Sequence, residues 1–368
     1  MREVLDDVAA WVAQGRSAAV ATVVRTWLSA PRQPGAAMAV SDAGEAVGSV
    51  SGGCVEGAVY ALGEQVLADH RAVLQRYGVS DDDAFAVGLT CGGTLEVFLE
   101  RIDAESFPEI IDVAASVRAG KAVAIATVVT GREPLGARLV VWPDRVGGGL
   151  GSARLDAAVT DDVRGLLQQG RSGMLHVGPD SERRRDELGL FVESFAPPPD
   201  MYVFGATDFA GAVVGIGKYL GYRVTLCDAR PVFATARRFP LADEIVVDWP
   251  HRWLPRVAVG PRTALCVLTH DPKFDVPLLE VALATEAGYI GVMGSRRTHE
   301  DRRQRLQELG LSEAALSRLH SPIGLDLGAR TPEETAVSIA AEIVSLRWGG
   351  SGQPLSGLDS RIHHDAAQ

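Results

Sequence analysis

Two cysteines that lie beside glycine pairs are the residues of this sequence best suited to carry chemistry. Cys54 follows Gly52 and Gly53, and Cys91 stands directly before another glycine pair. Because glycine lacks a side chain, the backbone beside each thiol can approach a ligand closely. A thiolate can act as a nucleophile, carry sulfur or bind a soft metal. We therefore predict both thiols as catalytic groups, Cys54 also as a metal ligand, and Gly52 and Gly53 as cofactor contacts.

The surroundings of Cys54 strengthen its candidacy. The segment SGGCVEG leads directly into a helical pattern, which places Cys54 at or near a helix N-terminus. The positive end of the helix dipole stabilises a thiolate, although Glu56 is close enough to oppose this effect. The alternative for either thiol is a buried, inert cysteine, the interpretation that we apply to Cys227 and Cys266 within predicted strands.

A glycine-containing turn in the C-terminal half has the context of a dinucleotide-binding fingerprint. Gly205 follows a strand and precedes a helix, and Asp228 ends the next strand at the expected distance. Thr207 stands at the second glycine position, and Asp208 adds negative charge where a phosphate would lie. We list Gly205, Thr207 and Asp228 as cofactor contacts, and keep open that this is a Rossmann-like turn that binds no dinucleotide.

Two further segments follow predicted strands of the C-terminal half. His270 and Asp271 come after the strand TALCVL, at the sheet edge where open α/β folds bind ligands, so His270 is an acid or base candidate. The alternative for Asp271 is a helix N-cap with Pro272 at the first helical position.

The other segment, GSRR, follows the strand YIGVM. Gly294, Ser295 and Arg296 join a small turn, a helix N-terminus and a guanidinium group, which together favour a phosphate. A purely structural role explains arginines at this end of a helix less well, because they oppose the helix dipole.

The elements that must position these residues fall into two groups. Residues 1–195 predict a mixed α/β domain without a strict βαβ repeat, including a strand over 84–89 and a helix over 55–77. Three prolines within 196–200 interrupt regular structure and predict a linker. Residues 201–348 alternate short apolar strands with helices, which predicts a Rossmann-like domain with a parallel sheet. Residues 349–368 are glycine-rich and polar and predict a flexible tail.

Composition narrows the class of protein. A chain of 368 residues with 46% hydrophobic and 23% charged content is ordinary for a globular protein and long enough for two domains. A net charge of -11 argues against nucleic acid as a partner. With no signal peptide pattern and no apolar run of about 18 residues, we expect a cytoplasmic protein that does not enter the membrane. Four cysteines without CxxC spacing predict neither a disulfide framework nor structural zinc.

Four segments, in order, resemble the XdhC/CoxI family of xanthine dehydrogenase accessory proteins: GSVSGGCVEG, GLTCGGTLEVFLE, YIGVMGSRRT and SPIGLDLGARTPEETAVSIAAEI. The resemblance spans both predicted domains. It implies a protein that binds the molybdenum cofactor, supports its sulfuration by a cysteine desulfurase, and delivers it to a molybdenum hydroxylase apoprotein. It implies a binding and delivery protein rather than a metabolic enzyme.

The resemblance also implies roles for individual residues. Cys54 becomes a candidate contact to molybdenum or to the transferred sulfur, with Cys91 as a second candidate. The phosphate end of the pterin, or its nucleotide extension, would lie against the Gly294 to Arg296 turn and the Rossmann crevice. The chain departs from the family at Thr207 and Asp208, where a glycine-containing pattern is more usual.

Two other functions remain open from the sequence. One is an NAD(P)-dependent oxidoreductase with His270 as acid or base. The other is a redox switch in which Cys54 and Cys91 form a reversible disulfide. In each case we expect a homodimer, because closed two-fold assemblies are common.

Overall fold

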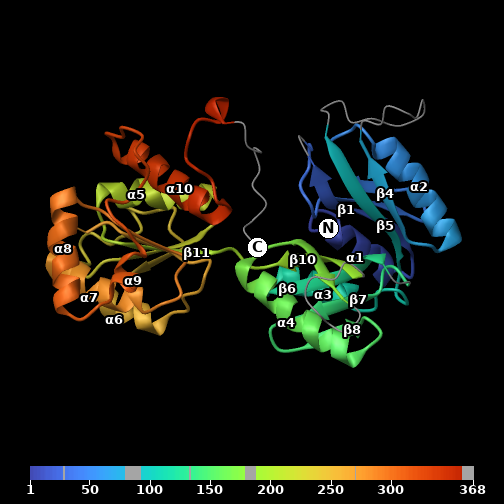
Figure 1. The fold of residues 1–368 in the computed structure, drawn as a ribbon, viewed down its shortest axis with the longest axis horizontal. Helices are drawn as coiled ribbons and strands as arrows, with labels where there is room; N and C mark the ends of the chain where they lie inside the picture. Colours follow the sequence, from blue (N-terminus) through green and yellow to red (C-terminus); the bar gives the residue numbers. More distant parts are fainter. Residues whose placement is uncertain (28–29, 79–92, 132–133, 179–187, 270, 359–368) are drawn as a thin grey trace. The chain divides into compact units, whose positions relative to one another are not determined.

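The computed structural model describes residues 1–27, 30–78, 93–131, 134–178, 188–269 and 271–358 (Figure 1). Cys91, His270 and the strand expected over 84–89 lie outside these residues. The chain divides into two compact units, Met1–Pro197 and Pro198–Gln368. The division falls within the run of three prolines at 197–199.

In the described residues, unit 1 contains two antiparallel sheets of five strands each. The first half supplies α1 Leu5–Ala13, β1 Ala18–Trp27, β2 Ala37–Ser41, β3 Ala46–Gly48, α2 Glu56–Asp69, β4 Val73–Tyr77 and β5 Thr94–Ile102. The second half supplies α3 Ile110–Arg118, β6 Val123–Gly131, β7 Arg138–Val141, β8 Val146–Gly149, α4 Ala153–Gln169, β9 Gly173–Val177 and β10 Leu188–Phe195. The strand orders are β3-β2-β1-β5-β4 and β8-β7-β6-β10-β9.

The two halves are copies of one fold. Their elements follow in the same order, and each sheet has the same strand order, counted from its own first strand. The irregularities coincide as well. The strand pairing shifts around Val24 in β1 and around Val129 in β6. Gly48 and Gly148 both have positive φ, and a Cβ on either would lie within 2.5 Å of a carbonyl oxygen of the neighbouring strand. Corresponding residues differ by 105 in number at Val24 and Val129 and by 100 at Gly48 and Gly148, and the offset of 100 aligns the loops that follow β3 and β8.

Apolar residues on alternating strand positions build the core of unit 1. In β1, Ala18 and Val20 join a cluster with α1 and α3, whereas Ala19 and Ala21 face α2. α4 covers the second sheet in the same way. This two-sided burial is the reason that β1 reads as a continuous apolar run.

The structure corrects part of the expected organisation of unit 1. The helix expected over 55–77 ends at Asp69, where His70 adopts a left-handed conformation, and Val73–Tyr77 forms the edge strand β4. β8, β9 and β10 were not predicted. The described residues of unit 1 contain no βαβ repeat, as expected, but the duplication of the whole half was not predicted.

Unit 2 has a six-stranded parallel sheet in the order β13-β12-β11-β14-β15-β16. Its strands are β11 Asp200–Phe204, β12 Arg223–Cys227, β13 Glu244–Val246, β14 Ala264–Val267, β15 Tyr289–Val292 and β16 Leu319–His320. Its helices are α5 Asp208–Tyr219, α6 Pro250–Trp253, α7 Pro272–Leu283, α8 Arg296–Glu308, α9 Glu313–Leu316 and α10 Pro332–Trp348, with short 3-10 turns at Leu254–Arg256 and Leu355–Gly357. Counted within unit 2 the strand order is 3-2-1-4-5-6, that of a Rossmann fold.

Helices cover both faces of this sheet. α5 and α10 pack on one face, and α6 to α9 pack on the other (Figure 1). Val203 of β11 faces the first group, whereas Tyr202 and Phe204 face the second. The predicted fold class, a mixed α/β domain followed by a Rossmann-like domain with a parallel sheet, is confirmed. Within the described ranges, no helix is both long and apolar enough to cross a membrane.

Candidate functional site

The segment Ser49–Glu56, which we call the thiol loop, joins β3 to α2 around a single carboxylate. Glu56 is the first residue of α2, and its side chain turns back into the loop. It accepts hydrogen bonds from the Ser49 and Ser51 hydroxyls at 2.6 and 2.5 Å. It also accepts from the backbone N–H groups of Val50 at 3.2 Å, Ser51 at 2.8 Å, Gly52 at 3.0 Å, Gly53 at 2.8 Å and Val55 at 3.2 Å.

These bonds fix the charge on Glu56. Burial opposes ionisation, but the hydrogen bonds from Ser49, Ser51 and the backbone outweigh it and lower the pKa of Glu56 to about 2. The carboxylate therefore stays ionised across the physiological pH range and remains an acceptor for the donors of the loop.

The glycine pair lets the backbone follow this curve. Gly52 and Gly53 have φ values of 79° and 121°, which residues with a side chain rarely adopt. Apart from the chain neighbours of each glycine, no described residue lies within 4 Å of the position that a Cβ would take on Gly52 or Gly53. The glycines are thus required by backbone conformation, and they leave open space beside the thiol.

Cys54 is held at the end of this curve. Its N–H donates to the Ser51 hydroxyl at 3.0 Å, and its half-buried side chain packs against the cluster under α2. Val55 is the N-cap of α2, so Cys54 lies just before the helix, as predicted. The N–H groups that could stabilise a thiolate here already serve Glu56 and Ser51.

Of the other three cysteines, two are buried in strands and one lies outside the described residues. Cys227 in β12 and Cys266 in β14 are buried, and burial raises the pKa of each thiol to about 12, which agrees with the inert role expected of them. The pairing of Cys54 with Cys91 stays a prediction, because Cys91 lies outside the described residues. Among the residues that are described, no three His, Cys, Asp or Glu side chains form a group that could hold a metal ion.

Unit 2 brings Gly205, Thr207 and Asp228 together at the carboxyl ends of β11 and β12. Gly205 has φ 103°, and a Cβ on it would lie 2.6 Å from the Thr269 side chain, so the turn requires glycine. Thr207 is the N-cap of α5, and its hydroxyl accepts from the Ala210 N–H at 3.3 Å. The residue at the second glycine position therefore serves the helix start.

The Asp228 carboxylate is occupied within the chain. It is buried and accepts from the Ala206 N–H at 2.6 Å. It also binds Arg230 through the backbone N–H at 2.8 Å and the guanidinium at 2.8 and 2.9 Å. Burial opposes its charge, yet the bonds from Arg230 and Ala206 lower the pKa of Asp228 overall. In dinucleotide-binding folds this carboxylate accepts a ribose hydroxyl.

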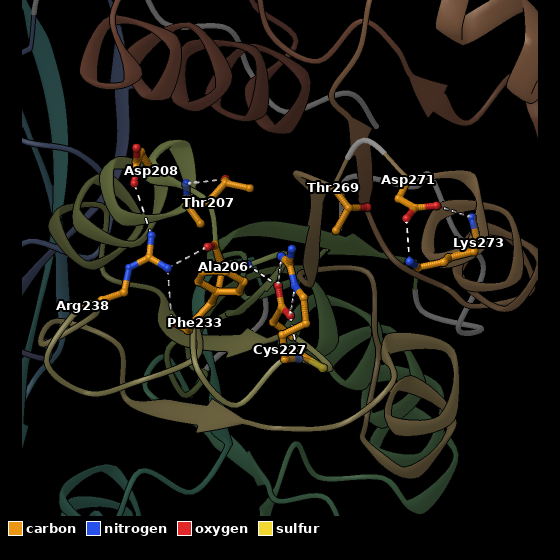
Figure 2. A network of polar contacts seen from close by, with 12 residues as sticks. Ala206, Thr207, Asp208, Cys227, Phe233, Arg238, Thr269, Asp271 and Lys273 are labelled. Atoms are coloured by element: carbon orange, nitrogen blue, oxygen red, sulfur yellow. Dashed lines mark hydrogen bonds and ion pairs between the residues drawn. The ribbon is translucent and has the colours of Figure 1, made fainter.

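A second arginine binds the other side of the turn that follows β11. Arg238 donates to the Ala206 carbonyl at 3.2 Å and to Asp208 at 3.2 Å, as Figure 2 shows. Between these groups lies a cavity of about 610 Å³. It is lined by Ala206, Thr207, Asp208, Phe209, Arg230, Val232, Phe233 and Arg238. Neither arginine was predicted as a site residue, although Arg230 stands two residues after Asp228.

The predicted phosphate turn lies elsewhere on the same sheet edge. Ser295 caps α8 and accepts from the Thr298 N–H at 3.1 Å, while Arg296 is exposed. Gly294 follows β15, which is separated from β11 by β14. Gly294, Ser295 and Arg296 are therefore together, but at a different strand end from the cavity. Their role as phosphate contacts stays a prediction.

A buried ion pair lies next to this turn and contacts the residue that precedes Gly294. Arg302 donates to Asp275 at 2.9 Å and to the Met293 carbonyl at 3.1 Å, and both side chains are buried. Asp275 also accepts from the Thr269 hydroxyl. The pair thus ties the end of β14 to the end of β15.

The start of α7 agrees with the structural alternative given for Asp271, and the start of α10 is also a capped one. Asp271 caps α7, with Pro272 as the first helical residue. Thr331 and Glu334 form a capping box at α10. The glycine-rich loop that leads to α10 is bound to that helix, since the Gly324 N–H donates to Glu342 at 2.9 Å. The hydrogen bonds of these segments thus serve the fold of unit 2.

Comparison with known proteins places the chain in a family. A model of the XdhC and CoxI family matches residues 11–78 and 116–178, and a model of the XdhC Rossmann domain matches residues 201–343. The chain belongs to the XdhC and CoxI family. The first two matched segments start in α1 and α3 and end after β4 and β9, so they are corresponding parts of the two halves.

Relatives are similar over most of their length. A protein of Bacillus subtilis (strain 168), named as a probable subunit of xanthine dehydrogenase, is 29% identical over 90% of this chain and 93% of its own. The molybdenum cofactor insertion chaperone PaoD of Escherichia coli (strain K12) is 26% identical over 90% of this chain and 84% of its own. A crystal structure of a xanthine dehydrogenase from Bacillus halodurans shares the fold, with a TM-score of 0.65 and 24% identity over 97% of this chain and 98% of that one.

Proposed function

We propose that this protein is a molybdenum cofactor insertion chaperone that delivers its cargo to a molybdenum hydroxylase apoprotein of the xanthine dehydrogenase class. Membership of the family and the similarity to the chaperone PaoD support the assignment. The observation that carries it is the thiol loop, in which hydrogen bonds to Glu56 hold a half-buried cysteine beside two glycines of positive φ.

The thiol loop suits a sulfur-rich metal centre. A thiolate is a soft ligand, and Cys54 sits on a loop whose conformation is set before any ligand arrives. The space beside Gly52 and Gly53 would admit the cofactor close to the backbone. Cys54 would contact the molybdenum or its terminal sulfur, and Glu56 would keep the loop in place without touching the cargo.

The finer steps extend this proposal. The chaperone would present the cofactor to a cysteine desulfurase-type sulfur donor and then release it to the hydroxylase, of the xanthine dehydrogenase or CO dehydrogenase type. Cys91 would assist Cys54 in the sulfur step. The cofactor would be molybdopterin, with or without a nucleotide extension, and the working form would be a homodimer.

Anaerobic reconstitution tests the proposal. The purified full chain is loaded with molybdenum cofactor, and bound metal and pterin are measured by elemental analysis and by pterin fluorescence. We expect stoichiometric binding that Cys54→Ala abolishes. The matched control is Arg154→Ala, which alters the corresponding exposed position of the second half and should bind like the wild type. A folded wild type that binds no cofactor would overturn the assignment.

A further inference from the structure

The cavity of unit 2 has the position and size of a nucleotide site. It lies between the turn after β11 and the loop after β12, outside the carboxyl ends of the strands, where open α/β folds bind ligands. Its volume of about 610 Å³ falls within the range of small-molecule sites. The cavity is lined by residues of unit 2 alone and includes none of the thiol loop.

The polar groups of this cavity exclude the usual way of holding a ribose. Asp228 cannot accept ribose hydroxyls, because it is 3% exposed and already binds the Ala206 N–H and the Arg230 guanidinium. In Rossmann folds an arginine near this position accommodates a phosphate on the ribose instead. Arg230 has that place, and its side chain is 46% exposed.

An aromatic ring completes the site. The Phe233 ring is 42% exposed, and the guanidinium groups of Arg230 and Arg238 lie 4.8 and 5.6 Å from its centroid. A planar base can stack on such a ring or on a guanidinium plane, while the guanidinium N–H groups bind phosphate oxygens in pairs. Figure 2 shows Phe233 and Arg238 on the same side of the Ala206 turn.

One acidic group decides where the phosphate lies. Asp208 opens α5 with its side chain 88% exposed, so it repels a diphosphate at the helix N-terminus, the usual position in dinucleotide complexes. It also engages Arg238. The favourable place for a phosphate is therefore beside Arg230, away from the helix start.

From this geometry we infer that the cavity binds a nucleotide through a phosphate monoester on the 2′ oxygen of its ribose, held by Arg230 with support from Arg238, while the base stacks on Phe233. NADP+ and 2′,5′-ADP belong to this class, whereas NAD+ and 5′-AMP do not. The ligand recognised is thus defined by the ribose phosphate rather than by a dinucleotide diphosphate.

Calorimetric titration of the full chain with these four probes tests the inference. We expect NADP+ and 2′,5′-ADP to bind roughly tenfold or more tightly than NAD+ and 5′-AMP, as a charge-assisted contact warrants. Arg230→Ala should remove this difference. Arg237→Ala changes an exposed arginine outside the cavity lining and should retain it.

A second variant separates recognition from folding. Asp208→Asn removes the repelling charge and releases Arg238, so it should strengthen binding of NADP+ by a few fold, an effect that misfolding cannot produce. Equal affinity for NAD+ and NADP+, tighter binding of 5′-AMP, or absence of binding by all four probes would each overturn the inference.

Discussion

The two halves of unit 1 share a fold but differ at the loop that leads into their long helix. In the first half, the Glu56 carboxylate gathers hydrogen bonds from seven groups of the thiol loop. In the second half, Asp156 occupies the corresponding position, and its carboxylate accepts from the backbone N–H of Leu150 at 2.7 Å. Arg154 stands where the first half has Cys54.

This difference moves the start of the helix. α4 begins at Ala153 with Ser152 as an ordinary N-cap, whereas α2 begins only at Glu56. The positions corresponding to Ser152 and Ala153 are Gly52 and Gly53, whose positive φ values stop the helix from extending backward. One copy therefore uses its loop for a plain helix start, and the other uses the same space to present a thiol.

The largest expected effect comes from removing the central carboxylate. Glu56→Ala leaves several loop donors without their acceptor and should lower the free energy of unfolding by about 3 kcal/mol. Asp156→Ala removes the bond to Leu150 and should cost about 1 kcal/mol. Denaturant unfolding of the two variants measures both values. Equal losses would show that the loops are equivalent, contrary to the comparison.

Lowering the pH should reduce the stability that the thiol loop contributes, over a defined range of pH. The pKa of Glu56 is about 2 in the folded chain and 4.5 ordinarily, so its ionised form stabilises the fold above pH 4.5. That contribution is lost as pH falls from 4.5 toward 2. The stability advantage of the wild type over Glu56→Gln should be full at pH 7 and much reduced at pH 3, measured by unfolding at each pH. An advantage that stays constant would rule out this role of the charge.

The glycines should tolerate substitution less well than their counterparts. Gly53→Ala forces a side chain into left-handed backbone and should cost about 1 to 2 kcal/mol. The matched change Ala153→Ser should stay within about 0.5 kcal/mol. The rate of Cys54 alkylation in Gly53→Ala reports whether the thiol has moved. Equal losses of stability in the two variants, measured by thermal unfolding, would contradict the requirement for glycine at position 53.

The smallest expected effect sharpens the comparison by transplanting the thiol. Arg154→Cys places a cysteine at the corresponding site but without the glycine pair and the carboxylate cradle. We expect no additional cofactor per chain in metal analysis. A second equivalent of bound molybdenum would mean that a cysteine at this position suffices, and that the loop architecture is unnecessary.

The sequence predicted much of this architecture because its signals are local. Alternating apolar segments located β11 to β15, and Asp271 with Pro272 marked the start of α7. The thiol loop stood out through its glycines and its cysteine. The predictions failed where pairing between distant segments decides the structure. β4 follows a helix without a proline between them, so its apolar and aromatic residues read as a continuation of the helix.

The duplication and the arginine site could not be predicted for the same reason, because both depend on contacts between segments that are distant in the sequence. The two halves share a strand order, but they share no short sequence motif that would reveal it. At corresponding positions their residues can differ in chemistry, as Cys54 and Arg154 do. Arg230 and Arg238 acquire meaning only when the loop after β12 folds against the turn after β11. Sequence spacing identified Asp228, but it could not show that the carboxylate turns inward.

Protection of Cys54 from alkylation tests the central claim most directly. The full chain is treated with iodoacetamide under anaerobic conditions, with and without molybdenum cofactor, and each cysteine peptide is quantified by mass spectrometry. Buried Cys227 and Cys266 serve as internal controls that should react slowly in both samples. We predict that Cys54 reacts readily in the unloaded protein and is protected once the cofactor is bound. Equal rates of Cys54 alkylation in the loaded and unloaded protein would contradict the account.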